Sequence, residues 1–203
     1  MNEDSKLIPL SQGAFAKVDA TDYAWLSQWK WSLHITKSGN RYAVRGYGPK
    51  GHRRIARMHQ EIMKTIPGVD PERETDHWDG DGLNNTRGNL RQATRAQNNF
   101  NRKKVRGISQ FKGVFLRKKT MRWSAEIKAN KHRIFLGEWS TGEEAAVARD
   151  DAARFLHGEF AALNLPERKQ GFFAVEEIRK EAKRRSYLRR DNAHHGRPCL
   201  VSL

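Results

Sequence analysis

Short stretches in which apolar and polar residues alternate begin the chain, and this period of two is typical of half-buried β-strands. The alternation is clearest in residues 29–35, and residues 41–47 follow them after a Ser-Gly-Asn turn at 38–40, which predicts a hairpin. Shorter elements are expected around this hairpin, namely strands at 6–10, 14–18 and 53–57 and one or two helical turns within 19–28. Residues 1–57 are therefore predicted to form a small β-rich unit.

Tryptophans gather on one face of this predicted sheet. Trp25, Trp29 and Trp31 are interpreted as core residues, because large apolar side chains are usually buried. The alternative is an exposed tryptophan that stacks on a nucleic-acid base. A short helix at 59–64 is expected to connect the sheet to the next segment.

A different pattern occupies residues 75–103, where two short extended arms flank a turn and a helix follows. The turn is predicted at the DGDG sequence of residues 79–82, because Gly accepts positive φ and Asp bonds its own backbone. Thr94 and Gln97 have the spacing of a capping box, which opens a helix. The predicted order is therefore strand, turn, strand and helix.

This segment collects residues that suit phosphodiester hydrolysis. Asp76 and the amide carbonyl of Asn98 can hold a single hard divalent cation, with water and a substrate phosphate completing its shell. His77 follows Asp76 in an extended strand, so it points to the opposite side and can take a proton from water. The amide carbonyl of Asn89 can fix its tautomer. A cation that stabilises a pentacovalent phosphate and a base that activates water are the two parts of such a reaction.

These residues resemble the HNH (ββα-metal) nucleases, and within that family the phage and intron-encoded homing endonucleases that lack zinc cysteines. The resemblance rests on DH at 76–77, DGDGLNN at 79–85, NLR at 89–91 and QNN at 97–99, with Met58-His59 upstream. It implies that His77 is the general base and that Asn89 orients it. It also implies that Asp76 and Asn98 bind one Mg²⁺ or Mn²⁺ ion.

The same residues allow two other interpretations. An EF-hand calcium loop that starts at Asp79 has Leu83 at its fifth position and Leu90 at its twelfth, so the required ligands are missing. The second interpretation makes His77 a structural histidine and the asparagines turn or cap formers. It leaves the asparagines at 98–99 unexplained, because Asn is a poor helix former.

Beyond a basic connector at 103–110, the pattern predicts three strands and a helix. The strands are expected at 113–116, 122–129 and 132–139. One face of the middle strand carries Trp123, Ala125, Ile127 and Ala129, and the other carries Arg122, Ser124, Glu126 and Lys128. Thr141 and Glu144 cap the helix, and Gly158 ends it. Alanines on this helix can lie close to the apolar face of the sheet, so the polar face stays free.

Residues 111–166 resemble the AP2/ERF DNA-binding domain. The sequences that carry this resemblance are FKGV at 111–114, RWSAEIK at 122–128, HRIFLGEWSTGEEAAVARDDAA at 132–153 and ALNLP at 162–166. Members of that family lay the sheet in the major groove of double-stranded DNA. The contact residues that the resemblance implies here are Lys112, Gly113, Arg117, Glu126, Lys128, Arg133 and Phe135.

Two positions depart from the family pattern. Phe115 stands where the family usually has an Arg, and Phe135 stands where it often has a Trp, so the family's base preference is not carried over. Independently, strand alternation places Glu126, Lys128, Arg133 and Phe135 on one exposed face. The alternative is a solvated basic face without a ligand.

The charge balance favours a polyanionic partner. Lys and Arg number 39 against 23 Asp and Glu, which gives a formal net charge of +16 at pH 7. Nucleic acid is the expected partner and an acidic membrane surface the runner-up. No stretch approaches the roughly 18 apolar residues of a spanning helix, and no signal-peptide core follows Met1. The sequence therefore predicts a soluble protein in the cytoplasm of a bacterial or phage-infected cell.

Cysteine usage constrains how the segment 75–103 is held. Cys199 is the only cysteine, so neither an intramolecular disulfide nor a cysteine-based zinc site is available. Packing must then hold the segment, and Trp78 and Phe100 are the expected anchors. The histidines at 194–195 with Cys199 are too few ligands at an unfitting spacing for a metal site.

The expected fold class is α+β, in four segments. These are a β-rich unit at 1–57, a ββα-metal nuclease element at 58–104, an AP2-like three-stranded antiparallel sheet packed on one helix at 105–166, and a basic helix or mobile tail at 167–203. The expected function is site-specific, metal-dependent cleavage of double-stranded DNA by a monomer. One alternative is a non-catalytic DNA-binding regulator with a decayed nuclease element, against which the intact Asp76, His77, Asn89 and Asn98 argue. RNA binding is disfavoured because both resemblances are to DNA-associated families.

Overall fold

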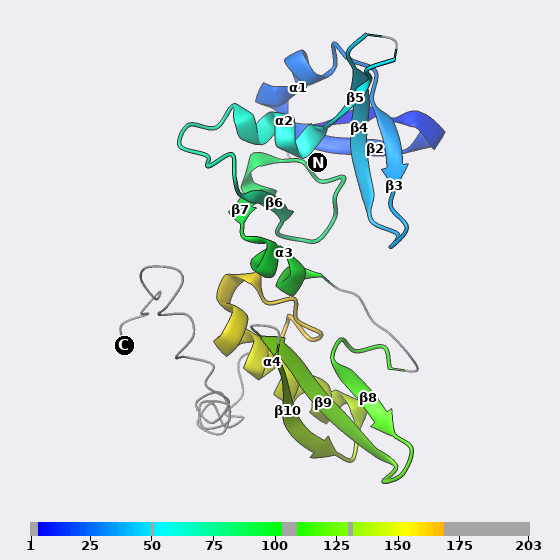
Figure 1. The fold of residues 1–203 in the computed structure, drawn as a ribbon, viewed down its shortest axis with the longest axis vertical. Coiled ribbons are helices and arrows are strands. Elements are labelled where there is room, and N and C mark those ends of the chain that lie inside the picture. Colours follow the sequence, from blue (N-terminus) through cyan, green and yellow to red (C-terminus); the bar gives the residue numbers. More distant parts are fainter. Residues whose placement is uncertain (1–3, 50, 103–108, 130–131, 169–203) are drawn as a thin grey trace. The chain divides into compact units, whose positions relative to one another are not determined.

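The computed structural model describes residues 4–49, 51–102, 109–129 and 132–168. The chain divides into two compact units, Met1–Arg102 and Lys103–Leu203 (Figure 1). Both units contain helices and antiparallel sheets, which confirms the predicted α+β class. Within the described ranges, no helix is long and apolar enough to cross a membrane. The predicted C-terminal helix or tail lies outside the described residues from 169 onward.

The first unit begins with two small sheets. The strands are β1 (Ser5–Pro9) paired with β2 (Phe15–Asp19), and β3 (Ser32–Ile35), β4 (Arg41–Tyr47) and β5 (Arg54–Arg57) in that order. The helices are η1 (Ser11–Gly13), α1 (Ala20–Leu26) and α2 (Met58–Lys64). The predicted strands are confirmed, but the one expected from residue 29 begins only at Ser32. Trp31 instead turns into the core, where its Nε1 donates to the Leu26 carbonyl at 2.8 Å.

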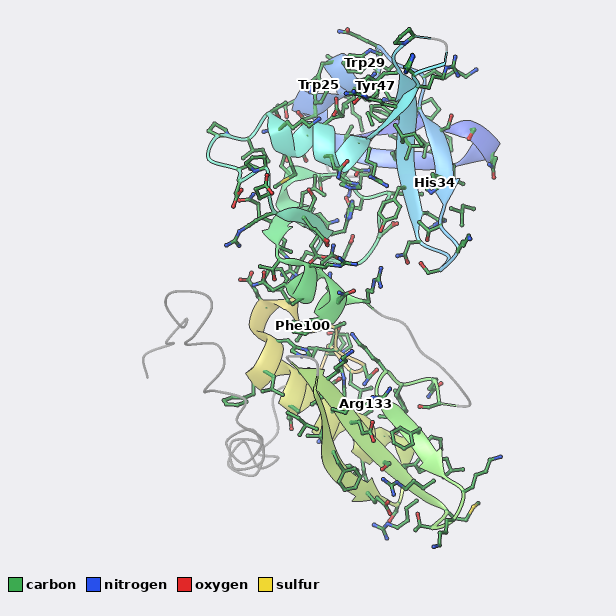
Figure 2. All side chains as sticks on the ribbon, viewed as in Figure 1. Trp25, Trp29, His34, Tyr47, Phe100 and Arg133 are labelled. Carbon is green, nitrogen blue, oxygen red and sulfur yellow. The ribbon has the colours of Figure 1, made fainter. Side chains whose placement is uncertain are left out.

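One hydrophobic core serves the whole first unit. Its buried residues include Ile8, Leu26, Trp31, Met58, Ile62, Leu83 and Leu90. They lie before and after residue 57, so the boundary drawn there from the sequence falls inside one packed unit. Trp31 is 2% exposed, as expected for a core residue, whereas Trp29 is 38% exposed. The guanidinium carbon of Arg45 lies 4.4 Å from a Trp29 ring centroid, so a cation already covers that ring (Trp29 is labelled in Figure 2).

The segment that the sequence singles out folds as strand, loop, strand and helix. β6 (Glu74–His77) pairs antiparallel with β7 (Leu90–Ala93), η2 (Arg87–Asn89) precedes β7, and α3 (Arg95–Asn101) follows it. The Thr94 hydroxyl accepts from the Gln97 N–H at 3.2 Å, and the Gln97 side chain accepts from the Thr94 N–H at 2.8 Å. The predicted capping box is therefore confirmed.

The loop between β6 and β7 is held by two strands that lie far away in the sequence. Lys17 of β2 donates its N–H to the Leu83 carbonyl at 2.8 Å and accepts from the Asn85 N–H at 2.7 Å. Gly82 lies against the Arg41 carbonyl at the start of β4, so closely that any added Cβ would clash with the backbone. These contacts give the loop a defined position, which local turn chemistry alone would not.

A partly buried ion pair joins η2 to α1. Asp22 is 1% exposed and accepts from Nε and Nη2 of Arg87 at 2.7 and 2.8 Å, and from Nε1 of Trp25 at 3.0 Å. The hydrogen bond from Arg87 lowers the pKa of Asp22, although burial opposes it. The turn that leads into the second strand of the segment 75–103 is thus tied to the first helix of the unit.

The second unit is a three-stranded antiparallel sheet with a helix across one face (Figure 1). Its elements are β8 (Val114–Arg117), β9 (Arg122–Ala129), β10 (His132–Trp139), α4 (Gly142–His157) and η3 (Gly158–Phe160). The buried contact joins Ala145, Ala146, Ala152 and Ala153 of α4 to Val114, Ala125, Ile127 and Ile134 of the sheet. The predicted cap by Thr141 and Glu144 and the stop at Gly158 are confirmed. The turn expected after Ala129 falls at residues outside the described ranges.

A β-bulge in β10 adjusts which side chains reach the face that α4 leaves bare. Phe135 pairs with Glu126, but the next pair joins Gly137 to Ala125, so Leu136 is the extra residue. Gly137 has a φ of +135°, and an added Cβ would lie 2.9 Å from the Trp139 ring. The bulge shifts the residues that follow it, so Glu138 lies opposite Ser124 on the bare face and Trp139 lies opposite Trp123 on the core side.

Candidate active site

The two faces of β6 separate the candidate catalytic residues. Glu74 and Asp76 lie on one face and His77 on the other, as strand alternation requires. Helix α3 covers the first face: Asn98 Nδ2 donates to Glu74 at 2.7 Å, and Asn101 Nδ2 donates to both carboxylate oxygens of Asp76 at 3.1 Å. His77 faces the loop between β6 and β7 instead.

Asp76 is 4% exposed and is held by two donors. Arg91, its pairing partner on β7, donates to Oδ2 from Nε at 2.9 Å, and its Nη2 lies 2.8 Å from the same oxygen. Asn101 also donates to the His77 carbonyl at 2.7 Å. One amide therefore fixes both the carboxylate and the strand that carries it.

The amide that contacts Asp76 is not the predicted one. The sequence pairs Asp76 with Asn98, but the side chain of Asn98 donates to Glu74, whereas the buried Asn101 contacts Asp76. The two asparagines are three residues apart, so both lie on the helix face that packs on β6. That spacing is the signal that could have identified Asn101. The ligand role of Asn98 stays a prediction.

His77 is buried, and its tautomer follows from its neighbours. Its Nε2 lies 3.3 Å from Oδ1 of Asn85, and Nδ2 of Asn85 donates to the Leu83 carbonyl at 3.1 Å. The amide oxygen of Asn85 must therefore accept, so Nε2 of His77 carries the proton and Nδ1 carries the lone pair. Burial lowers the pKa of His77, although the Asn85 hydrogen bond and three nearby aspartates oppose this. The imidazole is a neutral base at pH 7.

The hydrogen bond expected from Asn89 to His77 is therefore made by Asn85 instead. The Asn89 amide closes the loop: its oxygen accepts from the Asp79 N–H at 3.0 Å, and its nitrogen donates to Asp79 Oδ1 at 3.0 Å and to the Asn84 carbonyl at 2.8 Å. Asn85, which is 0% exposed, ends the DGDGLNN string that carries the resemblance, but the sequence gives it no catalytic role. Its place in that string, eight residues after His77, is the signal that could have made it a candidate partner of this histidine. A catalytic role for Asn89 stays a prediction.

Two further rings surround the candidate base. His59 at the start of α2 meets His77 edge to face, with ring centroids 4.9 Å apart, and Tyr42 of β4 lies 5.5 Å from His59 and 6.1 Å from His77. His59 is 5% exposed, and burial, with a smaller effect of His77, lowers its pKa to about 3. The imidazole of His59 is thus a neutral packing partner of His77.

Trp78 does not anchor the segment as expected, because it is 64% exposed. The hydrogen bonds of Asn89, Asn101 and Asn85 hold the segment in its place. Amide side chains suit this task, because each can donate and accept at once, whereas an indole has a single donor.

The bare face of the second unit carries most of the residues expected to contact DNA. Arg117, Glu126, Lys128, Arg133 and Phe135 project from it, together with Phe115 and Arg122. Gly113 lies at its edge, where its carbonyl accepts from the Glu126 N–H at 2.8 Å. Lys112 is half-buried, and burial, with the nearby charge of Arg149, lowers its pKa to about 7.

Known proteins match the chain in two ways. It is 50% identical over 60 residues to the dehydration-responsive element-binding protein 2E of Oryza sativa subsp. japonica, and 45% identical over 58 residues to an ethylene-responsive transcription factor of Arabidopsis thaliana. Each match covers 28% of this chain but 18% and 32% of those proteins, so the chain spans well under half of their length. These names agree with the AP2/ERF resemblance. No protein-family model matches the chain.

The second kind of match is longer. The chain is 33% identical over 164 residues to an uncharacterized HNH endonuclease of Acanthamoeba polyphaga mimivirus, and the match covers 78% of this chain and 79% of that protein. The chain belongs to the HNH endonuclease family. The resemblance noted for residues 75–103 therefore extends to a relative of similar length.

The residues of this HNH family member fit a hard divalent cation. A carboxylate has about four lone-pair positions, so the contacts with Arg91 and Asn101 do not by themselves fill Asp76. Glu74 adds a second carboxylate on the same strand face, and oxygen ligands of this kind suit Mg²⁺ and Mn²⁺. Across the described ranges, no group of three or more His, Cys, Asp or Glu residues could hold a metal ion. Water and a phosphate oxygen would complete the shell.

Replacing Asn101 with alanine is expected to slow DNA cleavage by about 10–100-fold, the usual effect of losing a residue that orients a ligand. The exposed Asn99 on the same helix is the matched control, and its alanine variant should cleave at the wild-type rate. Single-turnover rates and melting temperatures of the Asn98, Asn99 and Asn101 variants provide the measurement. A larger loss for Asn98→Ala than for Asn101→Ala would favour the ligand assignment made from the sequence.

Proposed function

We propose that this HNH family member is a site-specific, metal-dependent endonuclease that hydrolyses phosphodiester bonds of double-stranded DNA. The observation that carries the proposal is the placement of Asp76 and His77 on opposite faces of β6. Asp76 meets the amide of Asn101 there, and His77 meets the amide of Asn85. A cation ligand and a neutral base thus stand next to each other in the chain, and each is held by its own hydrogen bond.

His77 acts as the general base in this proposal. Its Nδ1 takes a proton from the attacking water, and the imidazolium that forms keeps its Nε2–H on the amide oxygen of Asn85. The contact of 3.3 Å is long for a hydrogen bond. Such contacts often tighten when substrate binds, and the added charge on His77 strengthens this one.

Asp76 and an amide carbonyl of α3 would bind one Mg²⁺ or Mn²⁺ ion. When bound, the ion supplies positive charge for the phosphate oxygens. Asn101 holds the carboxylate of Asp76 in place, and the lone pairs that these contacts leave over would be available to the ion. Arg91 stands beside Asp76, and its planar donors suit a phosphate oxygen of the substrate.

The second unit supports the DNA part of the proposal. Its bare sheet face is positively charged, because Arg117, Arg122, Lys128 and Arg133 outnumber Glu126 and Glu138. The relatives that match it are named as an element-binding protein and a transcription factor. This face would bind the duplex and position the nuclease element at its site.

Cleavage is expected to need Mg²⁺ or Mn²⁺ and to stop in EDTA, because Asp76, Glu74 and the α3 amides supply oxygen ligands only. Incubation of the full chain with a phage-genome library, with each cation or with chelator, followed by sequencing of the ends, tests this and gives the cut sites. Zinc is expected to be inactive or inhibitory. Undiminished cleavage in EDTA would contradict the metal requirement. Selective binding without cleavage in any cation would favour the non-catalytic regulator.

A further inference from the structure

Two of the basic side chains on the bare face of the β8–β10 sheet are paired with carboxylates of the same face. Arg133 Nη1 lies 3.5 Å from Glu126 Oε2, and Arg117 Nε lies 3.1 Å from Glu138 Oε1. Arg117 also donates to Ser124 Oγ at 3.3 Å. The face keeps a positive charge that suits phosphates. Arg117 and Arg133, however, already direct part of their guanidinium groups at acceptors of the protein.

Two phenylalanines stand between these pairs and remain exposed. Phe115 is 37% exposed and Phe135 is 43% exposed. Phe115 pairs across to Ser124 and Phe135 pairs across to Glu126, so the two rings flank the middle strand on successive rows of the face. The guanidinium carbon of Arg117 lies 5.3 Å from the Phe135 ring centroid, within the range of a cation–π contact. Neither ring belongs to the core clusters beneath α4.

The structure holds Phe135 on this face. Phe135 lies on this face by ordinary strand alternation, and the bulge at Leu136, which Gly137 permits through its positive φ, brings Glu138 to the same face. Without the extra residue, Glu138 would not reach the bare face, and the Arg117 pair that borders Phe135 would be lost. An exposed ring held in this way is a feature of the fold rather than a loose surface residue.

A phenyl ring has no donor or acceptor, so it cannot read the hydrogen-bonding pattern of a base edge. The apolar group that the major groove of an unmodified duplex presents is the C5-methyl group of thymine. We propose that Phe115 and Phe135 bind thymine methyl groups and make the second unit selective for sites with thymine at defined positions. This inference rests on the proposed DNA binding and adds the base that is read.

The test removes the methyl group without changing a hydrogen bond. A preferred duplex is selected from a random library by the full chain in EDTA, which prevents cleavage, and each thymine is then replaced by deoxyuridine. We expect one or two positions at which the replacement weakens binding about fourfold, the effect of one buried methyl group. Replacements at other positions should leave the Kd unchanged.

Phenylalanine variants assign the effect to the two rings. In Phe115→Ala and Phe135→Ala, the ratio of the thymine and uracil affinities should fall to one at the position that each ring contacts. Phe155→Ala is the matched control, because this phenylalanine on α4 is 39% exposed, and its ratio should stay at the wild-type value. Folding of each variant is checked by its melting temperature.

Three outcomes count against the inference, and they differ from one another. If the chain binds DNA selectively but replacing thymine by deoxyuridine changes the Kd at no position, the proposed contact with thymine methyl groups is wrong and the proposed function stands. A uracil effect that persists in both phenylalanine variants would overturn the assignment to these rings. The absence of any selective binding to duplex DNA would overturn the DNA-binding proposal itself, and this inference with it.

Discussion

His77→Ala is expected to abolish DNA cleavage and to leave DNA affinity nearly unchanged. The imidazole acts on the attacking water, so its loss removes an interaction of the transition state and little of ground-state binding. Removal of a general base usually costs about 10²–10⁴ in rate. Single-turnover cleavage at saturating DNA and a Kd measured in EDTA give the two numbers. Cleavage within about tenfold of wild type would contradict the assignment.

Two asparagine variants sharpen this test. Asn85→Ala removes the acceptor for Nε2–H, so a large part of the His77 effect should appear at unchanged affinity. Asn89→Ala opens the loop between β6 and β7, so it should lower the melting temperature as well as the rate. Rate loss without destabilisation in Asn89→Ala, together with little effect of Asn85→Ala, would return the orienting role to Asn89.

The pH profile offers a second measurement on the same residue. A general base works in its neutral form, and burial lowers the pKa of His77 below 6.5. The neutral form therefore persists as pH falls through 6.5, and a cation at Asp76 would lower the pKa further by charge repulsion. We expect the acid limb of kcat/KM to lie below pH 6.5. An acid limb above that value would mean that another group controls the reaction.

Much of the fold follows from local sequence patterns. The turn at 38–40 located β4, the pattern of residues 122–139 located β9 and β10, and the two Thr-x-x-Glu/Gln signatures located the starts of α3 and α4. Strand alternation also predicts that Asp76 and His77 face opposite sides. These features depend on neighbours within a few residues, which is why a single sequence reveals them.

The partners of the candidate catalytic residues depend on distant contacts. Asn85 and Asn89 both favour turns, and nothing local decides which of them reaches His77. The choice is made by Lys17 of β2, whose backbone binds the loop at Leu83 and Asn85. That contact joins segments far apart in the sequence, so residue spacing could not predict it.

A similar limit applies to α3. Asn98 and Asn101 share one face of α3. Which of them contacts Asp76 depends on the position of the helix along β6. The boundary drawn near residue 57 from the change in pattern likewise missed the core that α2 and β7 share with β1 and α1. Shared burial appears only when the segments are packed together.

The largest stability effect is expected from Asp150→Ala in the second unit. Arg149 and Asp150 are both 1% exposed, and Arg149 Nη1 donates to Asp150 Oδ1 at 3.0 Å. Asp150 also accepts the backbone N–H groups of Asn164 and Leu165 at 2.7 and 2.8 Å. Its removal would leave a buried guanidinium without its carboxylate and two N–H groups without an acceptor. Breaking such a pair costs about 3–5 kcal/mol of unfolding free energy.

Hydrogen exchange of the full chain, followed by peptide mass spectrometry, measures this loss within the second unit. Faster exchange should appear throughout β8–β10 and α4 and leave the peptides of the first unit unchanged. Glu143→Ala removes an exposed carboxylate of the same helix, and we expect it to cost at most about 1 kcal/mol. Equal effects of the two variants would contradict the role given to Asp150.

A double variant decides whether the uncompensated charge is the cause. Arg149→Met together with Asp150→Ala removes both charges and keeps an unbranched apolar side chain, so it should regain part of the stability lost in Asp150→Ala. The N–H groups of Asn164 and Leu165 stay without their acceptor, so recovery should be incomplete. If the double variant regains no stability, the whole loss in unfolding free energy comes from the 161–165 segment and not from the charge of Arg149. Selective DNA binding should follow the same order among the variants, because the bare sheet face depends on α4 behind it.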